Sequence, residues 1–385
     1  MTSWLPIAAA SGFGLANLPY GVDDNSALVA VGDAALDLTA CARAIGSPYA
    51  DIVAAPSLDG LLAAGAPVWA AVRADVATWL TDPSYRSVVE PLLRARDDAS
   101  LRLPFTVGDY VDFYASEQHA TNLGRILRPS EPALRPNWHH LPVGYHGRSG
   151  TVVVSGTPIV RPQGQLAAGR FGPTERLDVE VEVGFVVGTP TAHGTPVPPS
   201  AFAEHVFGVC LVNDWSARDI QAWEYQPLGP FLGKSFATSV SPWIVPLAAL
   251  SAARVPVGSA GRELTPYLRE DEPWGLDISL ELQRNGEVIS RPPYRDMFWS
   301  PAQMLAHMTV NGASVRTGDL YASGTVSGAD RSQWGSLIEL YDNGSFLDDG
   351  DETVISGSAP AADGGRLSFG EVRGAVRPAA AAHRD

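Results

Sequence analysis

Apolar and polar residues near the start of the chain alternate in short blocks. Residues 15–22, 27–31 and 34–38 are largely apolar, and Asp-Asp-Asn and Gly-Asp turn signals separate them. Short apolar runs bounded by such turns are typical of β-strands. The pattern therefore predicts a small β unit at the start of the chain.

A helical periodicity follows this unit. Apolar residues recur every four positions at Val68, Val72, Val76 and Leu80. That spacing predicts an amphipathic helix, and residues 83–96 predict a second one. The charged stretch 94–102 then gives way to Pro104. We place a domain boundary there, which gives domains at 1–104 and 105–385.

The remainder of the chain is rich in Gly and Pro and carries short apolar runs at 151–155, 177–187, 206–212 and 353–356. This spacing favours a mainly β domain with long functional loops over βαβ units. The Ala-rich tail, 378–385, predicts a frayed end.

The clearest pattern is the alternation Leu-Asp-Val-Glu-Val-Glu-Val at 177–183. Period-two alternation predicts a strand with one packed face, so Asp178, Glu180 and Glu182 share the other face. Residues two apart on a strand lie about 7 Å apart. The acidic face is either solvated or a site for a hard cation, and the alternation alone does not decide between them.

A second polar group follows the run 206–212. Asp214 ends the predicted strand, and Ser216 is a plausible N-cap for a short helix. On that helix Arg218, Gln221 and Tyr225 share one face, which suits polar recognition or stabilisation of an oxyanion.

The next segment, 227–235, ends in Gly-Lys-Ser. A phosphate-binding loop needs a Gly at position 228, where this chain has Leu, and two prolines stiffen the segment. We therefore interpret Lys234 as a fixed positive charge for a developing anion.

Ser116 is a candidate cap for a helix that ends before Pro129, with His119 in its first turns. A single His is either structural or a base, and an orienting carboxylate would favour the base. The loop 137–149 holds further histidines. A zinc site there is conceivable, but no Cys lies nearby, and Tyr145 is the better candidate for a substrate contact.

Composition narrows the classes of function. The chain has 27 Lys and Arg against 42 Asp and Glu, a formal net charge of −15. This balance disfavours nonspecific nucleic-acid binding and docking on anionic membranes. An acidic substrate would need local cations to reverse the potential.

Two cysteines, Cys41 and Cys210, cannot make a disulfide framework, and Cys210 fits a small buried hydrophobe. Residues 1–15 lack the basic start of a secretory signal, and no run approaches the roughly 18 apolar residues that span a bilayer. We expect a soluble, cytoplasmic protein.

Five motifs together resemble one enzyme family. They are YVDFYASEQHATN at 110–122, LPVGYHGR at 141–148, VNDWSARDIQ at 212–221, PLGPFLGKS at 227–235 and ASGTVSG at 322–328. The matching blocks run from about 107 to 370 and are similar to the fumarylacetoacetase (fumarylacetoacetate hydrolase) family, and the N-terminal region resembles a diverged copy of that family's first domain.

The resemblance implies a mainly β protein, with an N-terminal SH3-like barrel and a C-terminal mixed β-sandwich roll, that works as a homodimer. It also implies metal-dependent hydrolysis of the carbon–carbon bond of 4-fumarylacetoacetate to fumarate and acetoacetate, at the end of tyrosine and phenylalanine catabolism. A 1,3-diketone acid is a good oxygen chelator, which agrees with a hard cation.

By the same resemblance His119 is the base that activates water, and Glu339 orients it. Calcium would be held by Asp112, Glu180, Glu182 and Asp214, and magnesium by Asp214, Lys234 and Thr238. Arg218, Gln221 and Lys234 would stabilise anions, and the first two would also bind substrate. The other substrate-binding residues would be Tyr114, Arg128, Tyr145, Tyr225 and Thr325. The expected residue type stands at every one of these positions.

Two alternatives remain open at this point. One is a related activity, such as an acylpyruvate hydrolase or a diacid isomerase or decarboxylase. The length of the chain counts against it, because those relatives tend to lack the separate N-terminal domain. The other is a noncatalytic calcium-binding scaffold.

Overall fold

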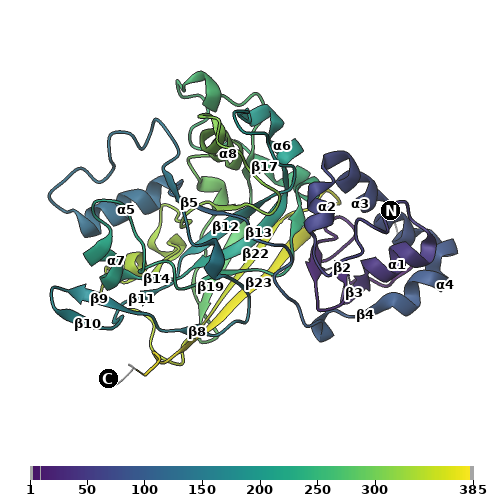
Figure 1. Ribbon diagram of the computed structural model, residues 1–385, viewed down its shortest axis with the longest axis horizontal. Coiled ribbons are helices and arrows are strands. Elements are labelled where there is room, and N and C mark those ends of the chain that lie inside the picture. Colours follow the sequence, from purple (N-terminus) through teal and green to yellow (C-terminus); the bar gives the residue numbers. More distant parts are fainter. Residues whose placement is uncertain (1–2, 9, 382–385) are drawn as a thin grey trace.

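The computed structural model describes residues 3–8 and 10–381, and in it a smaller N-terminal part packs beside a larger β-rich part (Figure 1). A mainly β protein, as the sequence predicts, is confirmed. Across the described residues 3–8 and 10–381, no helix has both the length and the apolar content needed to cross a bilayer.

The N-terminal part contains a four-stranded antiparallel sheet in the order β1-β2-β3-β4, with helices beside it. Its elements are β1 (Tyr20–Val22), β2 (Ala27–Val31), β3 (Ala34–Asp37), α1 (Leu38–Ile45), α2 (Asp59–Ala63), α3 (Ala66–Thr81), α4 (Arg86–Val89) and β4 (Leu93–Ala95). The predicted β unit and the first predicted helix are confirmed.

The second predicted helix, at 83–96, is wrong as a continuous element. The segment holds single 3-10 turns at Pro83–Tyr85 and Glu90–Leu92, the four residues of α4, and the edge strand β4. Pro91 explains why α4 does not continue, because proline lacks the N–H of a helix interior.

Two mixed sheets form the larger part. The first has the order β6-β5-β21-β12-β13-β15-β7, with β16 also paired to β13, and the second has the order β20-β19-β22-β23-β8. β5 runs parallel to β21, β7 to β15 and β8 to β23.

The strands of the first sheet are β5 (Tyr110–Phe113), β6 (Gly144–His146), β7 (Val152–Val154), β12 (Val181–Val187), β13 (Val206–Asp214), β15 (Thr238–Val240), β16 (Val245–Pro246) and β21 (Leu320–Ala322). Those of the second are β8 (Ile159–Val160), β19 (Ser279–Arg284), β20 (Glu287–Ser290), β22 (Glu352–Pro360) and β23 (Arg366–Arg377). The apolar runs named above as strands therefore form strands.

Among the residues that the structure describes, three short strand pairs and five α-helices also belong to the larger part. The pairs are β9 (Gln163–Ala167) with β10 (Arg170–Pro173), β11 (Leu177–Asp178) with β14 (Ser216–Ala217), and β17 (Arg254–Val255) with β18 (Gly275–Leu276). The helices are α5 (Glu117–Leu127), α6 (Phe202–His205), α7 (Arg218–Glu224), α8 (Pro301–Thr309) and α9 (Leu337–Leu340).

Strand β13 is buried on both faces, which explains its unbroken apolar run. Val209 and Leu211 join the core that the second sheet also lines, through residues such as Ile355. Cys210 and Val212 face the other way, into a core shared with the N-terminal part. The expectation for Cys210 as a buried hydrophobe is confirmed.

Strand β23 forms hydrogen bonds with a segment near the start of the chain. Ser368 of β23 donates its backbone N–H to the carbonyl of Gly12 at 2.8 Å, and the Asn17 side chain donates to the carbonyl of Ser368 at 2.7 Å. The N-terminal part is therefore held by a strand that comes more than 340 residues later.

Candidate active site

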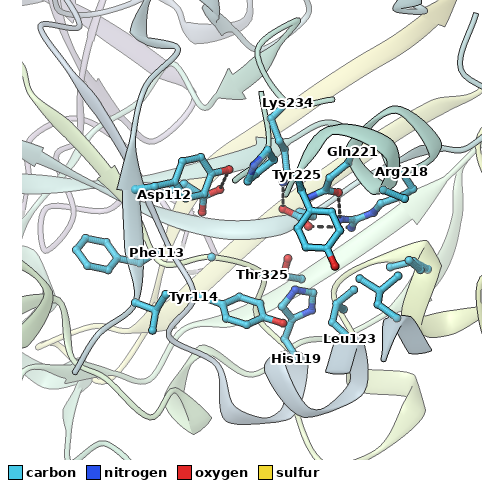
Figure 2. A pocket seen from close by; sticks show the side chains of 18 of the residues that line it. Asp112, Phe113, Tyr114, His119, Leu123, Arg218, Gln221, Tyr225, Lys234 and Thr325 are labelled. Carbon is cyan, nitrogen blue, oxygen red and sulfur yellow. Dashed lines mark hydrogen bonds and ion pairs between the residues drawn. The ribbon is translucent and has the colours of Figure 1, made fainter. Parts of the chain in front are cut away.

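A cavity of about 540 Å³ opens between β5, β6, α5 and α7. In Figure 2 the labelled side chains surround one space, with His119 and Tyr114 at its lower side and Lys234 and Gln221 at its upper side. Residues predicted from the sequence that line it are Asp112, Tyr114, His119, Arg128, Tyr145, Glu180, Arg218, Gln221, Tyr225, Lys234 and Thr325.

Helix α5 places His119 at the cavity. The side chain of Ser116 accepts the backbone N–H of His119 at 3.3 Å, and the helix ends at Leu127, before Pro129, so the predicted capping is confirmed. Gly324, directly before Thr325, takes φ 74°, and a Cβ there would lie 2.1 Å from the carbonyl oxygen of Phe113.

His119 pairs with a buried carboxylate. Its Nδ1 lies 2.7 Å from Oε2 of Glu339, which is fully buried in α9. Asn122, Ser327 and Ser336 also donate to that carboxylate, at 2.6–3.0 Å. Burial raises the pKa of Glu339, but the charge of His119 and these hydrogen bonds outweigh burial and hold it below its ordinary value.

Three acids converge at one side of the cavity. Carboxylate oxygens of Asp112, Glu182 and Asp214 lie within 4.8 Å of one another, and all three residues are buried. Both oxygens of Glu182 are buried without a hydrogen-bond partner in the described chain. Burial, reinforced by the neighbouring carboxylates, raises the pKa of Glu182 well above its ordinary value.

Glu180 lies beside this triad but is paired with cations. Its Oε2 contacts Nζ of Lys234, and its Oε1 lies 2.8 Å from Nη2 of Arg218. Burial raises the pKa of Glu180, but Lys234 and Arg218 outweigh it and leave the pKa below its ordinary value. The solvated interpretation of the acidic strand face is therefore wrong, because all its acids are buried.

Lys234 also contacts Asp214, with Nζ 2.6 Å from Oδ2, and Thr238 donates to Oδ1 of Asp214 at 3.0 Å. The three residues expected around magnesium therefore lie together. Burial lowers the pKa of Lys234, but Asp214 and Glu180 outweigh it and raise the pKa above its ordinary value. Lys234 is thus a buried ammonium.

The face of α7 agrees with expectation, because Arg218, Gln221 and Tyr225 all line the cavity. The N-cap assignment to Ser216 is wrong. Ser216 lies in β14, where its hydroxyl donates to the carbonyl of Asp214 at 3.0 Å, and Ala217 precedes the helix without a side-chain cap.

Arg148 is a functional candidate that sequence reasoning missed. Its Nη2 lies 2.8 Å from Oδ2 of Asp112 and 2.7 Å from Oδ2 of Asp214. Tyr145 donates to Asp112 at 2.9 Å and accepts from Nη1 of Arg148 at 2.8 Å. The signal was available, because Arg148 is the last residue of the motif LPVGYHGR.

Asn122, Ser327 and Ser336 were also missed as supports of the site, since single hydroxyls and amides carry no recognisable spacing. Asp178 was marked as part of the acidic strand face, but its contacts with Arg218 and α9 were not predicted. The histidine loop shows no zinc arrangement. His139 pairs with Glu117 at 2.8 Å and His146 with Asp109 at 2.6 Å. Among the residues that the structure describes, the acidic triad is the only group of side chains that fits a metal ion.

The unpartnered Glu182 carboxylate and the converging oxygen donors fit a hard divalent cation. In the described chain, the three buried carboxylates have two cationic side chains beside them, Arg148 and Lys234. Such a group is costly unless a further cation or protons balance it.

Two family models match the chain. Residues 110–377 match the family model described as fumarylacetoacetate (FAA) hydrolase C-terminal, and residues 16–104 match the model described as fumarylacetoacetase N-terminal. The fumarylacetoacetase of Homo sapiens is 43% identical over 98% of this chain and 99% of its own length. The enzymes of Caenorhabditis elegans and Arabidopsis thaliana are 41% and 40% identical, over 98% of this chain and 100% and 99% of theirs.

Solved structures share the fold at lower identity. A fumarylacetoacetate hydrolase from Exiguobacterium antarcticum superposes with a TM-score of 0.54 at 19% identity, over 94% of this chain and 99% of its own. A maleylpyruvate hydrolase from Sphingobium sp. SYK-6, in complex with manganese(II) and pyruvate, gives 0.53 at 16%, over 94% and 100%.

Proposed function

The chain belongs to the fumarylacetoacetase family, and we propose that its cavity hydrolyses 4-fumarylacetoacetate to fumarate and acetoacetate. This makes it a hydrolase of carbon–carbon bonds in ketonic substances, acting at the end of tyrosine and phenylalanine breakdown. The observation that carries the proposal is the buried His119–Glu339 pair facing Lys234 and Arg218 across one cavity.

His119 is the general base. Glu339 accepts from Nδ1 and so leaves Nε2 free to take a proton from water, as in other oriented imidazole bases. The hydroxide equivalent adds to the carbonyl carbon next to the fumaroyl double bond. The bond from that carbon to the central methylene then breaks, and its electron pair leaves as the enolate of acetoacetate.

That enolate is the difficult leaving group, and two cations are placed for it. Lys234 is a buried ammonium, and Arg218 with Gln221 presents further donors into the cavity. Preorganised donors in a dry site stabilise a developing anion strongly. The methylene carbon takes the proton that water supplied through His119, so water ends with oxygen in fumarate and hydrogen in acetoacetate.

The other lining residues position a dianionic substrate. Thr325 has a buried hydroxyl with no partner in the described chain, and Nε of Arg128 is likewise unpartnered. Both therefore have donors to offer a bound carboxylate or carbonyl. Tyr114, Tyr145 and Tyr225 complete the walls.

We also propose a resident divalent cation. Asp112, Glu182 and Asp214 would hold calcium, with Glu180 beside them, and Asp214 with Thr238 would offer oxygens to magnesium. Lys234 contributes charge there rather than a ligand, because an ammonium has no lone pair. A hard cation held there would supply Lewis acidity to polarise a carbonyl group of the substrate.

Three further properties belong to the proposal. The four-stranded N-terminal sheet would be the family's SH3-like barrel and the two mixed sheets its β-sandwich roll. The protein would act as a homodimer in the cytoplasm, and light scattering of the purified protein tests the dimer. The related hydrolase or isomerase activities and the noncatalytic scaffold are less favoured, since the curated relatives are fumarylacetoacetases and the base, carboxylate and lysine are all present.

Turnover of fumarylacetoacetate in ¹⁸O-labelled water tests the function. The purified protein should consume the diketone absorbance and release fumarate with one labelled carboxylate oxygen. His119→Ala should abolish turnover, whereas His307→Asn, which changes an imidazole paired with Tyr267 outside the cavity, should not. A wild-type protein that leaves this diketone intact but cleaves an acylpyruvate would contradict the proposal.

A further inference from the structure

Asp178 is a buried carboxylate that does not line the cavity, and the proposed chemistry gives it no part. Its Oδ2 accepts from Nε of Arg218 at 2.8 Å and from the backbone N–H of Ile338 at 3.2 Å. Its Oδ1 accepts from the N–H groups of Leu337 at 2.7 Å and Val179 at 2.8 Å. Four donors from three separate segments therefore meet on one side chain.

Two of these segments supply residues with different roles in the proposed reaction. Arg218 reaches from Asp178 towards Glu180 and Gln221 and presents its guanidinium to the cavity. Leu337 and Ile338 begin α9, in which the next residue is Glu339.

Helix α9 has only four residues and no side-chain cap from Ser336, so its own hydrogen bonds constrain it weakly. The contacts to Asp178 fix where its first two residues lie, and hence where the carboxylate of Glu339 meets His119. No other acceptor takes these two N–H groups in the described chain.

We infer that Asp178 is a positioning residue that sets the placement of Arg218 relative to the His119–Glu339 pair. The inference rests on the proposed function, since it assigns a role within the same reaction. A carboxylate suits this role because it offers only acceptors to four donors. An amide at this position would turn its NH2 group towards an N–H and push one of the two segments away.

Two variants test the role. Asp178→Asn keeps the shape and removes acceptors, while Asp178→Glu keeps the charge and shifts the carboxylate by one methylene. Each should lower kcat about 100-fold, the size expected for a misplacement near 1 Å, and change KM far less. Asp178→Glu also serves where Asp178→Asn does not fold.

Asp351→Asn is the matched control. Asp351 accepts from Nε of Arg284 at 3.0 Å, from the N–H of Asp348 at 2.8 Å and from Asn285 at 2.7 Å, and it lies outside the cavity lining. This variant should lower the melting temperature and leave kcat unchanged. A merely structural Asp178 would behave in the same way.

A double-mutant cycle supplies the second readout. With Arg218→Met already present, Asp178→Asn should cost clearly less in kcat than it costs alone, because part of its effect runs through Arg218. Full multiplication of the two losses, or an Asp178→Glu protein with wild-type kcat, overturns the inference. Absence of wild-type turnover of fumarylacetoacetate would instead overturn the proposed function.

Discussion

His119 and Glu339 stand 220 positions apart in the chain, yet Nδ1 of one lies 2.7 Å from Oε2 of the other. The pair is buried, and three further side chains donate to the carboxylate. This fixes the direction of the imidazole before any substrate arrives, which is a requirement for an efficient base.

Glu339→Gln should lower kcat by about 10²–10⁴-fold, because the amide cannot both keep the hydrogen bonds of Asn122 and stabilise a charged His119. Steady-state turnover of fumarylacetoacetate measures this. Glu281→Gln, which alters a partly exposed acid paired with Arg291, is the control and should turn over normally. A Glu339→Gln enzyme within twofold of wild type would show that the imidazole needs no such partner.

At low pH the protein should lose the stability that the ionised carboxylate of Glu339 contributes. The folded pKa of Glu339 is below its ordinary 4.5, so its contribution is present above the unfolded pKa and is lost as pH falls through the folded one. Urea unfolding should therefore show the stability difference between wild type and Glu339→Gln shrinking as pH drops below about 4.5. A difference that stays constant down to the acid limit would contradict the assignment.

Glu182→Gln should remove the effect of calcium on the melting temperature. Added Ca²⁺ at 100 times its dissociation constant stabilises a protein by about 2.7 kcal/mol, which is a clear rise in melting temperature. Wild type should show this rise and lose it in EDTA, whereas Glu182→Gln should melt equally with and without Ca²⁺. Glu281→Gln again serves as the control and should keep the rise, and equal calcium responses in all three proteins would place the cation elsewhere.

Lys234→Met should be inactive and less stable. It leaves Glu180 and Asp214 without the ammonium that each contacts, and breaking one side of a buried ion pair costs about 3–5 kcal/mol. Turnover and chemical denaturation measure the two effects. A stable variant with normal kcat would show that Arg218 alone absorbs the charge of the leaving enolate.

Gly324→Ala should destabilise the segment that leads to Thr325. A Cβ there meets the Phe113 carbonyl oxygen at 2.1 Å, in addition to the cost of φ at 74°. Gly46 has the same φ, and a Cβ added there would meet nothing within 4 Å, so Gly46→Ala isolates the backbone cost. We expect Gly324→Ala to lose at least about 2 kcal/mol more in thermal unfolding; equal losses would mean that the Phe113 strand yields.

From the sequence, the strands and the residues near the cavity could be predicted better than the contacts that those residues make with one another. Alternation at 177–183 marked the acids, but it gave no sign that Glu180 faces Lys234 while Glu182 has no partner in the described chain. Those differences arise from a break between β11 and β12 and from side chains brought in by other segments. Periodicity also could not detect Pro91 interrupting the helix expected at 83–96, where local backbone chemistry overrides the pattern.

Arg148 was missed for a related reason. Its place in the motif LPVGYHGR marked it as a candidate, but only the folded chain brings it between Asp112 and Asp214. The same holds for Asp178, most of whose donors come from segments that are remote in sequence.

The bond between Asn17 and Ser368 has a consequence for synthesis on the ribosome. While the chain is still being translated, the N-terminal part lacks the strand that secures it, and Glu339 emerges late as well. A chain that stops before Ser368 therefore lacks a strand that secures its N-terminal part and should be less stable. One that stops before Glu339 also lacks the carboxylate that orients His119 and should be inactive.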